Sequence, residues 1–213
     1  MPAPRAFIIH GYQSYPEEAW LPWLKTELEK RDYTVALPAM PTPDHPVISE
    51  WIDFIAKLVG EPDENTIMIG HSMGCQAVIR YLETLGAVGK SVGTTVLVAG
   101  GFPPGLTAAQ ADAILHGNKV LQPWFMTPVN PACVKKAAGK CTVILSDDDP
   151  YIDIAQAKAS FRANLDPEII IETGKGHYNE DDKVTELPAA LKAVTSYRRA
   201  RAQSEGSPSR GDG

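Results

Sequence analysis

Six short apolar segments recur along the chain, and longer stretches with helical spacing of apolar residues separate them. Each segment is aliphatic or β-branched at most positions instead of alternating with polar residues; the segments cover residues 6–9, 34–37, 66–69, 94–99, 142–145 and 168–171. Such composition is typical of parallel strands with both faces covered. The sequence therefore predicts six buried strands.

The connecting stretches place apolar side chains at intervals of three and four residues, which is the spacing of one helix face. The clearest stripe consists of Ile48, Trp51, Ile52, Ile55, Leu58 and Val59, and similar stripes lie within residues 17–30, 77–85, 154–165 and 184–194. Repeated strand–helix alternation implies right-handed crossovers with helices on both sides of a sheet. We therefore predict an α/β fold with a mostly parallel sheet of about six strands.

Two regions depart from this alternation. Residues 101–140 contain Pro103, Pro104, Pro123, Pro128 and Pro131 and no clear strand pattern. A connection this long is typical of a lid or pocket wall, so we expect a lid-like insertion here. Residues 204–213 carry no large apolar side chain and are expected to form a disordered tail. The rest, residues 1–203, is expected to form a single domain.

Charge and cysteine content exclude several classes of function. The net charge is −6 and the pI about 5.4, so no basic surface for nucleic acid is expected. The three cysteines, Cys75, Cys133 and Cys141, include no C-x-x-C pair, which argues against zinc and disulfides and is typical of a cytoplasmic protein. No segment approaches the roughly 18 apolar residues of a membrane span. We expect no metal, no cofactor and a small-molecule substrate.

Residues 70–74, Gly-His-Ser-Met-Gly, fit the G-x-S-x-G pattern of a nucleophile elbow. A serine on such a strand-to-helix turn needs glycines two residues before and after it, and the following helix directs amide N–H groups at a developing oxyanion. Residues 89–93 fit the same pattern, but Ser91 follows a helix and precedes a strand. The context therefore favours Ser72 as the nucleophile.

A serine nucleophile requires a histidine base, and in this fold the chain order is nucleophile, acid, histidine. Of the five histidines, His177 alone follows the last predicted strand, in Gly174-Lys175-Gly176-His177. The acid is expected in the run Asp147-Asp148-Asp149, where one carboxylate accepts a hydrogen bond from histidine Nδ1–H and the other two cap the next helix. Spacing does not choose among the three, and the run lacks the alternation of a calcium loop.

Several sequence blocks, in this order, carry a resemblance that covers nearly the whole chain up to the tail. They are His10-Gly11, residues 20–24 (Trp-Leu-Pro-Trp-Leu), residues 38–41 (Pro-Ala-Met-Pro), residues 70–74, residues 146–150 (Ser-Asp-Asp-Asp-Pro) and Gly176-His177. With these blocks the chain resembles the small serine hydrolases typified by retinoblastoma-binding protein nine and its bacterial relatives. The resemblance implies a compact α/β-hydrolase fold that lacks the first strands of the larger enzymes.

The resemblance also implies roles for particular residues. It assigns the acid to the aspartate before the proline, Asp149, and the oxyanion hole to the backbone N–H groups of Met73 and Tyr12. The expected reaction is hydrolysis of an ester, thioester or amide through an acyl-enzyme. An acyltransferase, or an interaction module with a vestigial triad, remains the alternative. The retinoblastoma-binding motif Leu-x-Cys-x-Glu does not occur in this chain.

Residues 124–126, which are Trp124, Phe125 and Met126, offer large apolar surface inside the expected insertion. Ligands of parallel sheets bind at the carboxyl ends of the strands, and the insertion follows one of those ends. We expect these three residues to line an acyl pocket, with packing into the core as the alternative for Trp124 and Phe125. The prolines of the insertion favour a small, preformed pocket for short acyl chains.

Overall fold

The computed structural model describes the backbone of residues 3–205 and the side chains of residues 3–196. Its centre is one sheet of six parallel strands in the order β2-β1-β3-β4-β5-β6. The strands are β1 (Arg5–Ile9), β2 (Thr34–Ala36), β3 (Thr66–His71), β4 (Thr94–Val98), β5 (Lys140–Ser146) and β6 (Glu168–Glu172). The predicted α/β fold with a six-stranded parallel sheet is confirmed.

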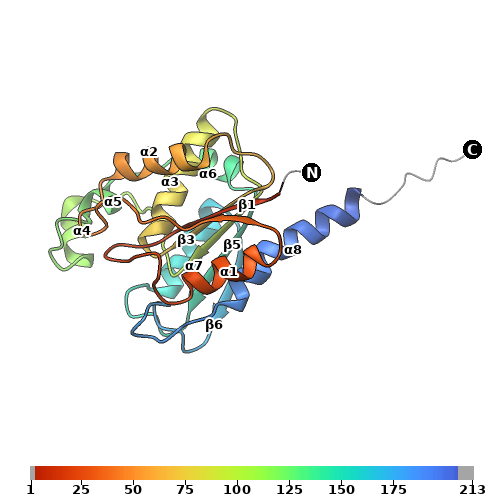
Figure 1. The fold of residues 1–213 in the computed structure, drawn as a ribbon. Helices are drawn as coiled ribbons and strands as arrows, with labels where there is room; N and C mark the ends of the chain where they lie inside the picture. The colour runs from red at the N-terminus through yellow and green to blue at the C-terminus, as the bar shows by residue number, and fades with distance from the viewer. Residues whose placement is uncertain (1–2, 206–213) are drawn as a thin grey trace, which may run out of the picture.

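Helices cover both faces of this sheet (Figure 1). They are α1 (Leu21–Glu29), α2 (Ile48–Val59), α3 (Met73–Ala87), α4 (Ala108–Ile114), α5 (Gln122–Met126), α6 (Pro131–Ala137), α7 (Ile154–Asn164) and α8 (Pro188–Glu205). Buried residues of α2, α3, α6 and α7 pack on one face, and those of α1 and α8 pack on the other. Among the described residues, no helix is long and apolar enough to cross a membrane.

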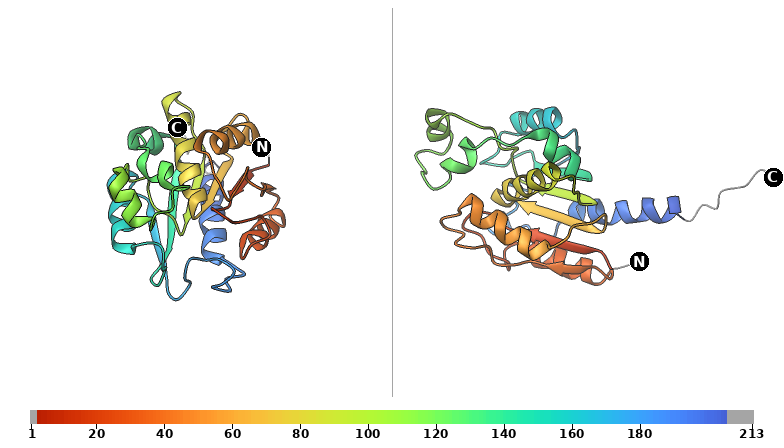
Figure 2. Two further views of the ribbon diagram at one scale, coloured as in Figure 1. Left: turned by 90° about the vertical axis from the view of Figure 1, so that its left-hand side faces the viewer. Right: turned by 90° about the horizontal axis from the view of Figure 1, so that it is seen from above.

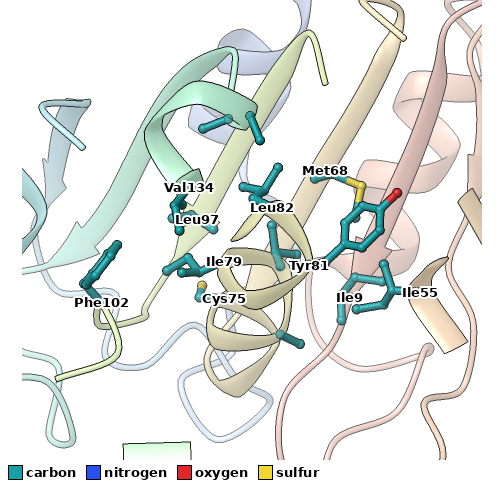
Figure 3. Packing of buried hydrophobic residues seen from close by; sticks show 14 of the residues in the cluster. Ile9, Ile55, Met68, Cys75, Ile79, Tyr81, Leu82, Leu97, Phe102 and Val134 are labelled. Atoms are coloured by element: carbon teal, nitrogen blue, oxygen red, sulfur yellow. The ribbon is translucent and has the colours of Figure 1, made fainter. Parts of the chain in front are cut away.

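Each strand supplies side chains to two separate apolar clusters because successive side chains of a strand point to opposite faces. Phe7 and Ile9 of β1 belong to the cluster under α3, whereas Ala6 and Ile8 belong to the cluster under α1 and α8. Figure 3 shows the first cluster, in which Ile79 of α3 lies close to Leu97 of β4. The four inner strands are almost wholly buried, but the edge strands β2 and β6 are only partly covered.

Two predicted helices begin later than expected. The stretches 17–30 and 184–194 become helical only at Leu21 and Pro188. At α8 the reason is Pro188, the first residue of the helix, because proline disfavours helical backbone in the residue before it. In α1, Pro22 lies in the first turn, where proline fits. Val184 and Leu187 are nevertheless buried in the cluster under α8, so the apolar stripe continues outside the helix. Helix α8 extends to Glu205, and the remainder of the predicted tail 204–213 lies outside the described residues.

The insertion 101–140 contains three short helices and not a strand until β5 begins at Lys140. Two of them, α4 and α5, extend beyond the sheet at the far left of the ribbon in Figure 1, and Figure 2 shows them apart from α8. Helix α6 packs along α3, with Val134 and Ala137 buried in the cluster that also receives Trp124 of α5. Only the part before α6 therefore lies over the carboxyl edge of the sheet.

Candidate active site

Ser72 occupies the sharp turn between β3 and α3. Its backbone angles are φ 53° and ψ −120°, in a region that residues with a side chain rarely adopt. The turn is held on both sides, since Ser72 N–H donates to Val98 O at 2.9 Å and Cys75 N–H donates to Ser72 O at 3.0 Å. These two hydrogen bonds hold the strained turn, and the hydroxyl of Ser72 therefore stays at the carboxyl edge of the sheet.

The two glycines of the elbow are required by close backbone contacts. A Cβ atom on Gly74 would lie 2.1 Å from the Ile9 carbonyl oxygen, and one on Gly70 would lie 2.7 Å from Cys75 N. Neither position can accommodate a side chain unless β1 or α3 moves. Ser91, in contrast, is exposed in the loop before β4, at the opposite edge of the sheet.

Three predicted residues from separate parts of the chain meet at this edge. Ser72 Oγ lies 2.8 Å from His177 Nε2, and His177 Nδ1 lies 2.8 Å and 3.1 Å from the two carboxylate oxygens of Asp149. A carboxylate only accepts, so Nδ1–H donates to Asp149 and Nε2 accepts the Ser72 proton. The Asp149 side chain is only 1% exposed. The arrangement is a continuous path for proton transfer away from the serine hydroxyl.

Asp149 is itself held in place by its own loop. Its Oδ1 accepts from Tyr151 N–H at 2.8 Å and from Ile152 N–H at 3.1 Å. The Tyr151 ring then packs edge-on against His177, with ring centroids 4.9 Å apart. Both the orientation of the acid and the plane of the imidazole are thereby restricted.

The loop that carries His177 is fixed by four successive side-chain acceptors. Its amides donate from Gly174 to Asp147 (2.9 Å), from Lys175 to Ser146 Oγ (2.9 Å), from Gly176 to Asp148 (2.8 Å) and from His177 to Asp182 (2.7 Å). Three of the acceptors are carboxylates, which form stronger hydrogen bonds than neutral groups. We call residues 174–177 with these four acceptors the histidine cradle.

This finding corrects the expected role of Asp147 and Asp148. They do not cap the next helix, because Asp153 accepts from Gln156 N–H at the start of α7. Asp148 instead also accepts the Ser146 hydroxyl proton at 2.6 Å, and this bond, followed by the Gly176 amide, lowers the pKa of its carboxyl. All three aspartates of the run therefore act on the histidine loop, one on the ring and two on the backbone.

A buried histidine lies directly beneath this loop. His71 Nε2–H donates to the His177 carbonyl at 2.9 Å, and the two ring centroids are 5.5 Å apart. Burial, followed by the neighbouring charge of His177, lowers the pKa of His71 to about 4. His71 is therefore uncharged near neutral pH and does not compete with His177 for a proton.

The predicted oxyanion donors lie beside the serine. Met73 is the first residue of α3, where the backbone N–H has no acceptor inside the helix. Tyr12 follows Gly11, and a Cβ atom on Gly11 would be 3.0 Å from Ser72 Cβ. His10 positions this segment: its ring contacts Gly11 O at 3.0 Å and accepts Met40 N–H at 2.9 Å. Burial lowers the pKa of His10, consistent with a neutral ring that accepts at Nε2.

Two adjoining cavities open at this edge. The first, of about 670 Å³, is lined by Ser72, His177, Met73 and Tyr12 among others, and the second measures about 540 Å³. Cavities of this size can enclose a drug-sized molecule. These cavities are larger than the small pocket expected from the prolines of the insertion, and the preference for short acyl chains stays a prediction.

The three aromatic and apolar residues predicted to line the pocket lie in different places. Trp124 is fully buried in the core, lines neither cavity and donates from Nε1 to Pro46 O at 2.8 Å. Phe125 lines both cavities, and Met126 is exposed and lines neither. Trp124 thus takes the alternative role of core packing, and Met126 lines neither of these cavities, because successive residues of a helix point about 100° apart.

Sequence reasoning missed three residues of the site. Gln76 lines both cavities, and its spacing of four residues from Ser72 along α3 was an available signal. Tyr151 and Asp182 contact the histidine loop through turns that no sequence pattern specifies. Within the part of the chain that the structure describes, no group of three or more His, Cys, Asp or Glu side chains could hold a metal ion.

A family match, a curated protein and a solved structure that resemble this chain are all hydrolases. The chain matches the family described as serine hydrolase over residues 6–196. It is 29% identical over 193 residues to the hydrolase YdeN of Bacillus subtilis (strain 168), covering 91% of this chain and 95% of that protein. The crystal structure of the ydeN product superposes with a TM-score of 0.78 at 25% identity, covering 92% of this chain and 100% of the other.

A more distant structure extends the likeness of fold. Est1E from Butyrivibrio proteoclasticus superposes with a TM-score of 0.66 at 14% identity, and the match covers 94% of this chain and 89% of that one. Identity this low shows a common fold alone.

Proposed function

The chain belongs to the serine hydrolase family and has the α/β-hydrolase fold, and we propose that it cleaves a carboxylic ester through an acyl-enzyme on Ser72. The observation that carries this proposal is the unbroken hydrogen-bond path from Ser72 Oγ through His177 to Asp149, with 2.8 Å at each step. Hydrolase activity follows from the family, and the ester substrate and the residue roles are our proposal.

In acylation, His177 Nε2 takes the hydroxyl proton as Ser72 Oγ attacks the carbonyl carbon. Asp149 stabilises the imidazolium that forms and keeps Nδ1 protonated. The backbone N–H groups of Met73 and Tyr12 then stabilise the negative oxygen of the tetrahedral intermediate, and the positive end of α3 adds to that stabilisation. The C–O bond of the ester breaks, and the proton on Nε2 passes to the leaving alcohol.

Deacylation repeats these steps with water in place of the alcohol. His177 takes a proton from water, the hydroxide attacks the acyl carbon, and Ser72 leaves with the proton returned from Nε2. An acyltransferase would use the same residues but pass the acyl group to another acceptor. A vestigial site would not react at all.

The test uses a fluorophosphonate probe together with a panel of p-nitrophenyl esters of increasing acyl length. We expect labelling and p-nitrophenol release by the native chain, and neither by Ser72→Ala with the fold retained. Ser91→Ala is the matched control, because Ser91 fits the same sequence pattern at the opposite edge of the sheet. Activity in Ser72→Ala, or its loss in Ser91→Ala, would contradict the proposal. Labelling with acyl transfer to added alcohols but not to water would favour the acyltransferase.

A further inference from the structure

The second cavity shares one wall with the cavity around Ser72. The shared lining consists of Gln76, Gly101, Ile114, Phe125, Tyr151 and Ile152. Much of the remaining lining is apolar and comes from the insertion, including Phe102, Pro103 and Leu106. A substrate bound at Ser72 can therefore extend past this wall into a largely apolar space.

The lining of the second cavity leaves out His177, which suits the acyl part of a substrate rather than its leaving group. His177 protonates the leaving alcohol, so the alcohol has to leave next to His177 Nε2. His177 lines the first cavity and is not among the described residues that line the second. The second cavity is bounded instead by the acid loop, α7 and the insertion, and one turn of α3 separates Ser72 from Gln76.

Gln76 is the deeply buried polar residue of the shared wall. It is 3% exposed, and among the residues that the structure describes its Oε1 finds no hydrogen-bond partner. The other polar residues lining the second cavity, such as Asp153 and Gln156, are partly or fully exposed. A buried carboxamide oxygen without a partner is costly and uncommon, and the residue that carries it lines both cavities.

We propose that Gln76 binds a hydroxyl group on the acyl part of the substrate, close to the carbonyl, while the apolar remainder of the acyl chain occupies the second cavity. The inference rests on the proposed function and specifies its substrate class as a hydroxyacyl ester. Gln76 is in this role a specificity residue, since it contacts the substrate without taking part in bond cleavage.

A hydroxyl is the substituent that suits a carboxamide in this position. It donates to Oε1 or accepts from Nε2, whichever way the amide is turned, whereas a buried charge would lack an opposite charge. The distance along the acyl chain follows from the helix. Residues four apart share one face and rise about 6 Å, and helical side chains lean toward the N-terminus. The Gln76 side chain therefore leans toward Ser72, which places the hydroxyl two to three carbons from the carbonyl.

The test compares phenyl 3-hydroxyhexanoate with phenyl hexanoate, which share a leaving group and differ by one hydroxyl. We expect the native enzyme to favour the hydroxy ester in kcat/KM on the order of tenfold, the effect of one hydrogen bond. Gln76→Leu should remove this preference, so that its kcat/KM values for the two esters become equal. Its melting temperature should equal or exceed the native value, because replacing an unpartnered buried amide by an apolar group is neutral or stabilising.

Other outcomes separate this inference from the function on which it rests. Phenol release from both esters without a preference by the native enzyme overturns the hydroxyacyl inference and leaves the hydrolase proposal standing. An equal fall of both rates in Gln76→Leu, with a lower melting temperature, makes Gln76 structural. Gln76→Met repeats the test should the leucine variant not fold. No phenol release and no probe labelling by the native chain overturns the proposed function itself.

Discussion

The histidine cradle and the insertion both lie at the carboxyl edge of the sheet, but they are held by different forces. In the cradle, four consecutive amides of residues 174–177 donate to side-chain oxygens, three of them carboxylates. The insertion is anchored by burial of Trp124 and by Arg80 of α3, which donates to the Trp124 and Thr127 carbonyls at 2.7 Å each.

The difference separates the two tasks of the site. Hydrogen bonds to charged acceptors are directional and fix the path of a backbone segment. Proton transfer requires such precision, because its donor and acceptor atoms must lie within a few tenths of an ångström of their reactive positions. Burial of a side chain such as that of Trp124 stabilises the insertion without directing its backbone. The shape of the two cavities then depends on a few lining side chains such as Phe125. We therefore expect changes in the cradle to affect rate, and changes at the anchor of the insertion to affect stability.

The largest effect is expected at Asp149, the acid that contacts the ring of His177 in the cradle. Asp149→Asn should reduce kcat on the order of 10⁴-fold, the size known for such a change, because an amide favours the wrong imidazole tautomer. Circular dichroism and the melting temperature should change little. Asp147→Asn is the control, since Asn keeps an oxygen that can accept from Gly174 N–H, and it should be nearly silent. A larger loss in Asp148→Asn than in Asp149→Asn would contradict the assignment.

The anchor of the insertion should show the opposite behaviour. Trp124→Ala should lower the free energy of unfolding by about 3–5 kcal/mol, because it leaves a cavity in the core. The ratio of kcat/KM between short and long acyl esters should stay unchanged. Phe125→Ala is the paired variant: it should alter that ratio with less loss of stability, since Phe125 lines both cavities. If Trp124→Ala alters the ratio as strongly as Phe125→Ala does, the anchor and the cavity wall are not separate.

The packing beneath the cradle predicts a dependence of stability on pH. His71 has a pKa of about 4 in the folded chain against 6.5 when unperturbed, so the unfolded chain binds the proton first as pH falls. The free energy of unfolding should therefore decrease from pH 6.5 toward pH 4, with His71 contributing up to about 3 kcal/mol. His71→Gln retains a donor for the His177 carbonyl and should flatten this part of the curve in urea titrations. An equally steep curve in the variant would assign the effect to His10 or other groups.

The smallest effect is expected at the fourth acceptor. Asp182→Ala removes the partner of the His177 amide and should reduce kcat on the order of tenfold, because the imidazole is less well placed. Asp182→Asn keeps an oxygen at that position and should recover most of the rate. A rise in KM alone, with kcat unchanged in both variants, would mean that the cradle does not position the base.

Local patterns in the sequence were enough to predict the sheet and two residues of the site. Parallel strands, amphipathic helices and the elbow at Ser72 each depend on residues a few positions apart, and His177 follows from its place after the last strand. The same local patterns misplaced two helix starts, and at α8 the reason is that Pro188 disfavours helical backbone in the residue before it.

Other features were decided only when distant segments came together. The aspartate that meets His177 is set by how the loops after β5 and β6 fold on each other, across 28 residues of sequence. Trp124 and Phe125 are neighbours in sequence, yet one lies in the core and the other lines the cavities, because the side of α5 that faces α3 is fixed by contacts such as that of Arg80. The spacing of apolar residues over a few positions determines which secondary structure forms. The contact partners of a side chain depend on which distant segments of the chain pack against it.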